Sequence, residues 1–268
     1  MADLTLSALT IYPVKSCAGI PLQRARLDRF GLEGDRRWML VDAAGRFITQ
    51  REHAGLALIR TRWDGTSLTL ARGAGQCLVA LPGEQALLRS VSVWGDSVVA
   101  RDAGDHAARW LQAHAGLACR LVFMPEATRR EVDKRYARRG ETVGFADGFP
   151  LLLISQASLD DLNGRLAQPV PMDRFRPNLV VSGCAAFAED SWRRIRIGAV
   201  AFDVAKPCAR CVVPSIDQQS GRRDPAINRV LAGFRRRDGA IYFGQNLLHD
   251  GSGALRLGDE VEVLSRVE

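Results

Sequence analysis

Two cysteines stand between two prolines in the segment Lys206-Pro207-Cys208-Ala209-Arg210-Cys211-Val212-Val213-Pro214. The segment directly follows a strand-like run at 199–204. Because Pro207 lacks a backbone N–H and has a fixed φ, we expect strand pairing to stop there and both thiols to lie on a constrained turn. Arg210 is adjacent to Cys211, and a neighbouring guanidinium favours the thiolate, the form that binds metals and attacks electrophiles.

The cysteine pair also fits less specific roles. Free cysteines are often buried as small hydrophobic residues, so a structural role stays open. A structural zinc site needs a second close pair of cysteines or histidines. The other candidates are scattered: Cys17, Cys77, Cys119, Cys184, His53, His106, His114 and His249. A thioredoxin-like motif opens a helix early in a βαβ unit, whereas this pair lies late in the chain. The sequence therefore favours one reactive or metal-ligating thiolate with a second sulfur nearby.

Size and composition indicate a globular protein. The chain has 268 residues, of which 47% are hydrophobic and 25% charged, enough for one large domain or two smaller ones. No apolar run reaches about 18 residues, so no membrane segment is predicted. The N-terminus has no basic stretch followed by an apolar one, which argues against export. Six unevenly spaced cysteines do not form a disulfide framework. We therefore expect a cytoplasmic protein.

The net charge of +7 raises the question of nucleic acid. No recognition-helix motif or aromatic RNA-binding motif accompanies it, so nucleic-acid binding is not predicted. The basic runs, 129–130, 135–139, 222–223 and 235–237, are separated in sequence, and most such runs are solvated faces. The alternative is that some of these cations line a pocket for a phosphorylated or other anionic ligand, because guanidinium binds phosphate in a bidentate manner.

The first half of the chain carries short strand patterns separated by glycines. A strand is predicted over 4–12 and is followed by the small-residue turn 14–20. Lys15 and Ser16 in that turn can bind an anion together with backbone N–H groups, although a plain hairpin connection is the simpler alternative. Further strands are predicted at 38–42, 46–49, 56–61, 67–70, 77–81, 90–93 and 120–124. Strands spaced by about 8–12 residues are typical of an antiparallel sandwich or barrel.

Helical patterns are fewer. One helix is predicted over 105–114 with Asp102 or Asp105 as its N-cap. A flexible loop over 125–140 is predicted to connect the two halves. After a buried strand at 151–154, Ser155 or Ser158 can cap a helix that runs to about residue 166. The remaining elements are strands at 179–182, two strands after Trp192, a helix at 224–231 and strands at 241–244 and 260–264.

Several motifs together resemble one family. They are Ile11-Tyr12-Pro13-Val14-Lys15-Ser16-Cys17, Asp35-Arg36-Arg37-Trp38, Ser155-Gln156-Ala157-Ser158-Leu159, Phe175-Arg176-Pro177-Asn178, Glu189-Asp190-Ser191-Trp192, Cys208-Ala209-Arg210-Cys211 and Phe243-Gly244-Gln245-Asn246. Their order and spacing resemble MOSC-domain proteins with an N-terminal β-barrel region, above all the mitochondrial amidoxime-reducing component and its bacterial relatives. The resemblance implies a mainly β fold with some α, in which a barrel-like region (1–124) precedes a mixed β-barrel MOSC domain with short helices (125–268).

The resemblance also implies a molybdenum cofactor, in which molybdenum is held by a molybdopterin dithiolene and by one cysteine thiolate. In this chain the ligating residue would be Cys211, and a soft thiolate suits such a metal centre. Cys208 would lie beside the metal or be structural. The matched motifs assign pterin and phosphate binding to Lys15, Ser16, Arg36, Ser155, Ser158, Arg176, Asn178 and Arg210. Asp147 corresponds to an acidic residue near the metal and would donate a proton or orient the substrate. The family also has an association with pyridoxal phosphate binding.

The function implied is an oxidoreductase that reduces small N-hydroxylated compounds. The chain has no G-x-G-x-x-G motif for a flavin or nicotinamide cofactor, which favours electrons from a separate flavin or haem protein. Mitochondrial members carry a targeting and membrane segment and some bacterial members a ferredoxin domain, and we expect neither here. One alternative is a sulfur carrier or cofactor-handling protein whose Cys211 bears a persulfide. Another is a protein that stores the cofactor without turnover.

Overall fold

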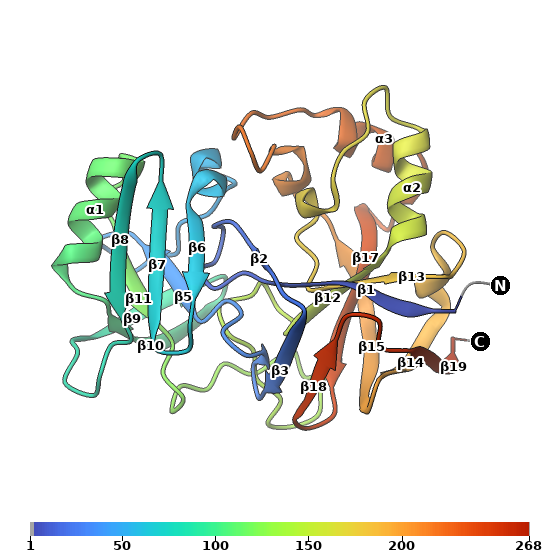
Figure 1. Ribbon diagram of the computed structural model, residues 1–268, viewed down its shortest axis with the longest axis horizontal. Helices are drawn as coiled ribbons and strands as arrows, with labels where there is room; N and C mark the ends of the chain where they lie inside the picture. The colour runs from blue at the N-terminus through green and yellow to red at the C-terminus, as the bar shows by residue number, and fades with distance from the viewer. Residues whose placement is uncertain (1–2, 268) are drawn as a thin grey trace.

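The computed structural model describes residues 3–267 and shows a mainly β chain, as predicted (Figure 1). Its largest unit is a nine-stranded sheet in the order β19-β14-β15-β17-β12-β13-β1-β2, with β16 paired to β17. These strands are β1 (Thr5–Ile11), β2 (Ile20–Pro21), β12 (Leu151–Ser155), β13 (Leu179–Ser182), β14 (Trp192–Ile197), β15 (Val200–Ala209), β16 (Arg236–Arg237), β17 (Ala240–His249) and β19 (Val261–Arg266). Only β12 and β13 run parallel, and the other pairs are antiparallel.

Two helices cover part of this sheet and enclose a core of their own. They are α2 (Gln156–Gly164) and α3 (Ala226–Arg235). Leu159 and Leu162 of α2 and Leu231 of α3 are buried with Phe175 and Phe243 in one cluster. The parallel β12–β13 pair needs a crossover connection, which α2 supplies. This arrangement fixes the segment after α2, which leads to Phe175, Arg176 and Asn178.

The first lobe, residues 38–123, is built from smaller sheets. One has the order β5-β11-β10-β9 and another the order β6-β7-β8. Their strands are β5 (Trp38–Val41), β6 (Arg60–Trp63), β7 (Ser67–Arg72), β8 (Gly75–Ala80), β9 (Leu88–Val93), β10 (Asp96–Asp102) and β11 (Arg120–Phe123). Helix α1 (Asp105–Ala115) buries Ala107, Trp110 and Leu111 against the strands. Figure 1 shows this lobe beside the one formed by the large sheet.

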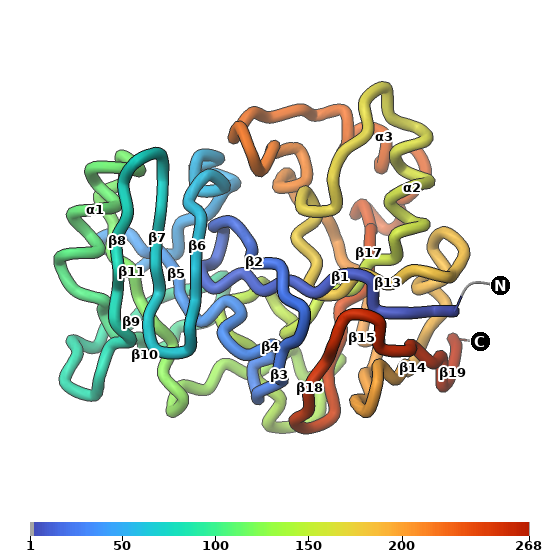
Figure 2. The backbone as a smooth tube through the Cα atoms, viewed as in Figure 1, coloured from blue at the N-terminus to red at the C-terminus, as the bar shows by residue number. Residues whose placement is uncertain are grey.

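The chain crosses between the lobes more than once. β1 pairs with β13 and so belongs to the large sheet, while β3 (Arg24–Asp28) pairs with β18 (Gly253–Arg256) and with β4 (Gly31–Leu32). Figure 2 shows both ends of the chain at the same side of the molecule. Because β1 belongs to the large sheet, the turn that follows it starts there and leads toward the first lobe.

The predicted domain division at residue 124 stays a prediction. No helix among the described residues is long and apolar enough to cross a membrane.

The predicted end of strand pairing at Pro207 is wrong. β15 continues through Pro207 to Ala209 against β17, with a register shift on each side of the proline. A strand tolerates proline at such irregularities, because the missing N–H then breaks no ladder hydrogen bond. Cys208 therefore lies on a distorted strand end, and Cys211 follows just beyond it.

Other differences are local. Residues 56–58 belong to the 3-10 helix η1 (Ala54–Leu58), because a short apolar run has no period that separates helix from strand. The residues 46–47 form only isolated bridges, and β10 was not predicted. Gly104, not an aspartate, caps α1, while Ser155 caps α2 as expected. The segment 125–140 contains turns and one isolated bridge but no helix or strand.

Replacing Ser155 with alanine is expected to lower the free energy of unfolding by about 1–2 kcal/mol, the usual contribution of an N-cap hydroxyl. The Ser155 hydroxyl accepts the Ser158 N–H at 3.1 Å and lies fully buried. Urea denaturation measures the change. The control is Ser182→Ala, whose hydroxyl donates to Ser7 at the surface and whose loss should cost less than about 0.5 kcal/mol. Equal losses for the two variants would contradict the capping role.

Candidate functional site

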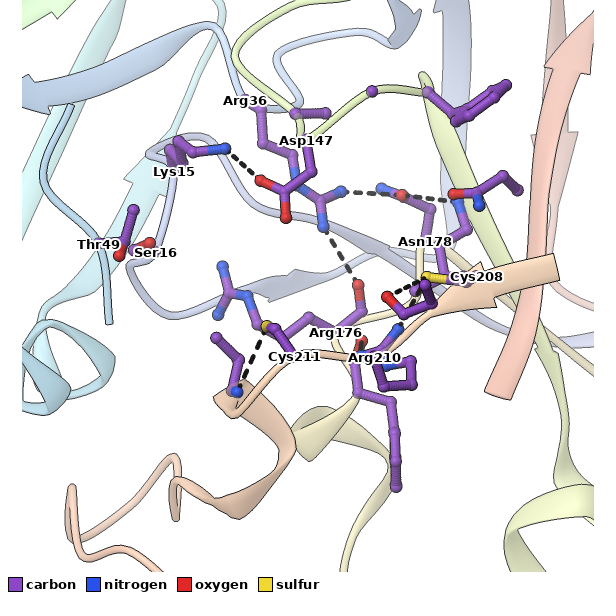
Figure 3. A pocket seen from close by; sticks show the side chains of 18 of the residues that line it. Lys15, Ser16, Arg36, Thr49, Asp147, Arg176, Asn178, Cys208, Arg210 and Cys211 are labelled. Carbon is purple, nitrogen blue, oxygen red and sulfur yellow. Dashed lines mark hydrogen bonds and ion pairs between the residues drawn. The ribbon is translucent and has the colours of Figure 1, made fainter. Parts of the chain in front are cut away.

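A pocket lies where the segments of the two lobes meet, and it contains both cysteines of the C-x-x-C motif (Figure 3). It is lined by Lys15, Ser16, Arg36, Thr49, Gln50, Arg51, Ala146, Asp147, Gly148, Phe149, Leu151, Leu152, Phe175, Arg176, Asn178, Cys208, Ala209, Arg210, Cys211, Val213 and Asn246. Eight of the ten predicted site residues are in this set. They come from segments on both sides of the molecule, so only the folded chain brings them together.

The two sulfurs have different surroundings. Cys211 precedes the 3-10 helix η4 (Val213–Ser215), and its Sγ accepts the Val213 N–H at 3.5 Å. Asn228 of α3 donates to the Cys211 carbonyl at 2.9 Å and fixes the backbone there. The Arg210 guanidinium donates to the Cys208 Sγ at 3.3 Å and to the Phe175 carbonyl at 2.7 Å. Arg210, which we expected to favour a Cys211 thiolate, thus contacts the Cys208 sulfur instead. The Cys211 sulfur accepts its hydrogen bond from a backbone N–H.

Two arginines stack on one tyrosine at the back of the pocket. The guanidinium carbons of Arg36 and Arg176 lie 4.3 and 4.2 Å from the centroid of the Tyr12 ring. The Tyr12 hydroxyl donates to the Pro177 carbonyl at 3.1 Å, and burial raises the pKa of Tyr12 to about 12. The phenol therefore stays neutral, and the ring supports both cations through its π face.

The Asn178 side chain forms hydrogen bonds with Arg36 and with the Thr10 carbonyl. The amide oxygen of Asn178 accepts from Arg36 at 2.8 Å, and Arg36 also donates to the Arg176 carbonyl at 3.1 Å. The Asn178 amide nitrogen donates to the Thr10 carbonyl at 3.1 Å. Because both ends of this amide are occupied by protein, Asn178 orients Arg36 rather than offering a free group to a ligand.

Three non-glycine residues of the pocket have left-handed backbone conformations. The φ angles of Ser16, Arg36 and Arg176 are 69°, 44° and 55°. Such conformations cost on the order of 1–3 kcal/mol each and are found preferentially at binding and catalytic sites. All three were predicted site residues. Their shared conformation is a second, independent indication that the pocket is functional.

Asp147 is the one carboxylate among the lining residues. It accepts hydrogen bonds from Lys15 at 2.5 Å, Arg51 at 3.0 Å and the Trp94 indole at 3.3 Å. Burial by itself would raise the pKa of Asp147, but the charges of Lys15 and Arg51 hold it well below its usual range. The side chain is 60% exposed, so the carboxylate is open to the pocket. Asp147 is thus ionised at neutral pH, which favours orientation of a substrate over proton donation.

The loop that carries Asp147 is held by buried contacts. Arg130 is 5% exposed and donates to the carbonyls of Gly144, Ala146 and Asp147 at 2.8, 2.6 and 3.1 Å. A Cβ at Gly144 would lie only 2.8 Å from the Arg36 carbonyl, so glycine is needed for this close approach. Arg130 belongs to a run that the sequence predicted to be a solvated face, and its burial corrects that prediction.

The lining carries more positive than negative charge. Lys15 and Arg51 share Asp147, and Arg36 pairs with Asp35 behind the wall. Arg176 and Arg210 pair with no carboxylate in the part of the chain that the structure describes, and the buried Nε of Arg210 has no hydrogen-bond partner. Five cations against one lining carboxylate fit an anionic ligand.

Ser155 and Ser158 lie outside the pocket. Both are fully buried under α2, and the Ser158 hydroxyl lies 2.7 Å from that of Ser155 and donates to Glu189 at 2.8 Å. Ser155 caps the helix through its hydroxyl, so neither group is free for a cofactor. In the structure this motif forms the start of α2 and does not line the pocket.

A pair of glutamines was not predicted. The amide nitrogen of Gln50 donates to Gln218 at 3.0 Å, and that of Gln218 donates back at 3.2 Å. Gln50 is fully buried and also donates to the Ser16 carbonyl at 2.7 Å, while Arg176 donates to Gln218 at 3.3 Å. The two glutamines are 168 positions apart, so no local pattern could have paired them.

Among residues 3–267 no three or more His, Cys, Asp or Glu side chains gather closely enough to hold a metal ion by themselves. A metal bound to a pocket cysteine would therefore take most of its ligands from a bound group. This donor set suits a cofactor that brings its own sulfur or oxygen ligands better than a bare ion.

Comparison with known proteins defines the class. Residues 3–116 match the MOSC N-terminal beta barrel domain, and residues 140–262 match the MOSC domain. The mitochondrial amidoxime-reducing component 1 of Mus musculus is 34% identical over 98% of this chain and 83% of its own length. The Homo sapiens protein of that name is 33% identical over 98% and 83%. The chain therefore belongs to the family of MOSC-domain proteins that includes the mitochondrial amidoxime-reducing components.

A more distant type of relative is also similar. The molybdenum cofactor sulfurase of Oryza sativa subsp. japonica is 32% identical over 91% of this chain, which corresponds to only 32% of the sulfurase. The family resemblance seen in the sequence is thus confirmed. The cytoplasmic location and the association with pyridoxal phosphate are not addressed by these relatives and stay predictions.

The charge of Lys15 should give anion binding a pH dependence. Burial lowers the pKa of Lys15 to about 8, although Asp147 acts in the opposite direction. Lys15 is therefore charged below pH 8 and neutral above it, and affinity for sulfate should fall about tenfold as the pH rises from 7 to 9.5. Sulfate is a suitable probe because its own charge is constant in this range. Isothermal titration calorimetry measures the affinity.

The control for this titration is Lys15→Met, which should bind sulfate weakly at every pH. A flat profile in the unmodified protein would contradict the assignment of Lys15 as a ligand-facing cation.

Proposed function

We propose that this protein is a molybdenum-cofactor oxidoreductase that reduces N-hydroxylated compounds with electrons from a separate flavin or haem protein. The observation that carries the proposal is the pocket itself, where two cysteine sulfurs lie among five cations and one carboxylate. The named activity of the amidoxime-reducing relatives, with which the chain shares about a third of its residues, supports the choice of substrate.

The lining residues fit the cofactor. Cys211 would supply the protein ligand to the metal, because it sits at a strand end with a free thiol and an amide donor on its sulfur. Arg176, Arg210 and Ser16 would hold the phosphate and the pterin. Among residues 3–267 neither guanidinium group pairs with a carboxylate, and the buried Arg210 Nε has no hydrogen-bond partner. The bound cofactor would supply the two-electron chemistry that cleaves the N–O bond.

The protein residues would orient the substrate and control charge. Asp147 is an anion at the pocket and accepts hydrogen bonds, so it can receive an N–H or O–H of an N-hydroxylated group. Arg36 is fixed by Asn178 and Asp35 and would supply positive charge to an anionic cofactor. The overall reaction converts R–NHOH, two electrons and two protons to R–NH2 and water.

The decisive experiment is analysis of protein purified from cells that make the cofactor. Molybdenum near one atom per chain, with a fluorescent pterin released on oxidation, supports the proposal. Reduction of an amidoxime with a chemical reductant such as dithionite then tests the activity without the unidentified electron donor. Protein from cells that cannot make the cofactor serves as the control. Cofactor-loaded protein that leaves the amidoxime unchanged would overturn the proposed activity.

Replacing each cysteine in turn should distinguish the roles of the two sulfurs. In Cys211→Ser the hard hydroxyl replaces the soft thiolate, so molybdenum content and reduction should both fall by at least about 100-fold. In Cys208→Ser the change should stay within about tenfold, because this sulfur accepts a hydrogen bond from Arg210 and serine keeps an acceptor there. Metal analysis and the reduction assay measure both variants. Equal losses would argue instead for a dithiol or a structural pair.

The second candidate function is a sulfur carrier in which Cys211 bears a persulfide. The similarity to a molybdenum cofactor sulfurase favours it. Mass spectrometry of freshly purified protein distinguishes the two, because a carrier would show one extra sulfur atom on Cys211 and no molybdenum. A protein that only stores the cofactor would contain molybdenum and would leave every N-hydroxylated substrate unreduced.

A further inference from the structure

The side-chain amides of Gln50 and Gln218 are each anchored by a backbone carbonyl. The Gln50 amide nitrogen donates to the Ser16 carbonyl at 2.7 Å, and the Gln218 amide nitrogen donates to the Ile216 carbonyl at 3.0 Å. The two amides also donate to each other, at 3.0 and 3.2 Å. Because a carbonyl can only accept, each amide nitrogen must face its carbonyl, and the orientation of both side chains is fixed.

This orientation directs the side-chain oxygen of Gln218 toward Arg176. The oxygen accepts from Gln50 at 3.0 Å and from the Arg176 guanidinium at 3.3 Å, which uses both of its lone pairs. Arg176 has a φ of 55°, and its guanidinium also stacks on the Tyr12 ring at 4.2 Å. A polar network in which every donor has an acceptor is rigid. Gln218 therefore restrains an arginine that has an unfavourable backbone conformation and lines the cysteine pocket.

The restraint on Arg176 adds no negative charge to the pocket. Arg176 is only 9% exposed, yet in the range 3–267 it pairs with no carboxylate. Buried charges are ordinarily paired with an opposite charge. The neutral amide of Gln218 holds the guanidinium by one hydrogen bond and leaves its charge available to an anion. A glutamate at the same place would neutralise that charge.

The loop that carries Gln218 is held against the first lobe by a further contact. Arg223 donates to the carbonyls of Gln50 and Arg51 at 3.4 and 2.7 Å. Within the loop, Asp217 Oδ1 accepts two backbone N–H groups at 3.1 and 2.7 Å. The position of Gln218 is therefore set by contacts on both sides of it.

We propose that Gln218 is a positioning residue that, together with Gln50, holds Arg176 in place for an anionic ligand of the cysteine pocket and leaves the charge of the arginine uncompensated. The ligand class is a phosphate-like oxyanion, because guanidinium groups bind such anions through charge-assisted hydrogen bonds. This inference rests on the proposed function of the pocket in taking it as an anion site.

Sulfate is the probe for the test. Calorimetry at pH 7 measures its affinity for the full chain purified from cells that cannot make the cofactor. Gln218→Met keeps the length of the side chain but removes the amide, so affinity should fall about threefold because Arg176 loses its restraint. Gln218→Glu places a carboxylate beside Arg176, so affinity should fall about tenfold or more. A role limited to holding the loop would make methionine at least as harmful as glutamate.

The matched control is Gln219→Glu, which adds the same charge at the next, exposed position of the loop. Its affinity for sulfate should change less than about twofold, because an exposed charge is screened by solvent. Thermal unfolding checks the fold of each variant. If Gln218→Glu does not fold, Gln50→Met takes its place. It removes the contact that orients Gln218, so affinity should again fall about threefold.

Four results would overturn the positioning role. They are equal losses for methionine and glutamate at position 218, unchanged affinity in Gln218→Met or Gln50→Met, a loss in the control as large as that in Gln218→Glu, and absence of sulfate binding to the unmodified chain. Sulfate binding needs neither molybdenum nor turnover, so its outcome is separate from that of the proposed activity. If the affinities follow the expected order but protein from cofactor-producing cells contains no molybdenum, the positioning role stands and the proposed oxidoreductase fails.

Discussion

The pocket depends on the contacts that Arg36 makes across the chain. Its guanidinium donates to Asn178 and to the carbonyl of Arg176, and it stacks on the ring of Tyr12 together with Arg176. These contacts connect a segment that follows the N-terminal strands to the segment after α2. Two cations beside each other repel, so the aromatic ring and the buried Asp35 partner of Arg36 are needed to hold them. The result is a fixed pair of cations in the same pocket lining as the two sulfurs.

Charge and strain coincide in this region. Asp147 is the single lining carboxylate, and it is shared by Lys15 and Arg51. Within residues 3–267 the positive charges of Arg176 and Arg210 have no carboxylate partner. Left-handed backbone at three lining residues and at Trp94 adds strain that the surrounding contacts must offset. A fold selected for stability alone would avoid both costs. Their concentration around one pocket is the physical reason to place the function there.

Much of the fold follows from local patterns. The strand at 179–182 and the capping of α2 by Ser155 were predicted from apolar runs and polar residues at their ends. Local patterns failed where a tertiary contact overrides them. Pro207 continues a strand because the pairing of β15 with β17 shifts register on both sides of it. Arg130 is buried because carbonyls of the Asp147 loop surround it. Ser155 and Ser158 are buried at the start of α2, a position that the local pattern of polar residues could not reveal.

The sequence by itself determined the family and the mainly β class, and it named eight residues that line the pocket, because motif order and residue type are properties of the chain. It could not show that Gln50 meets Gln218 or that Arg210 contacts Cys208 rather than Cys211, since these depend on how distant segments are placed. The tertiary structure also decided the ionisation of Asp147 and the position of Trp94 beside it. Electrostatic and stacking interactions depend on distance in space, and sequence separation carries little information about that distance.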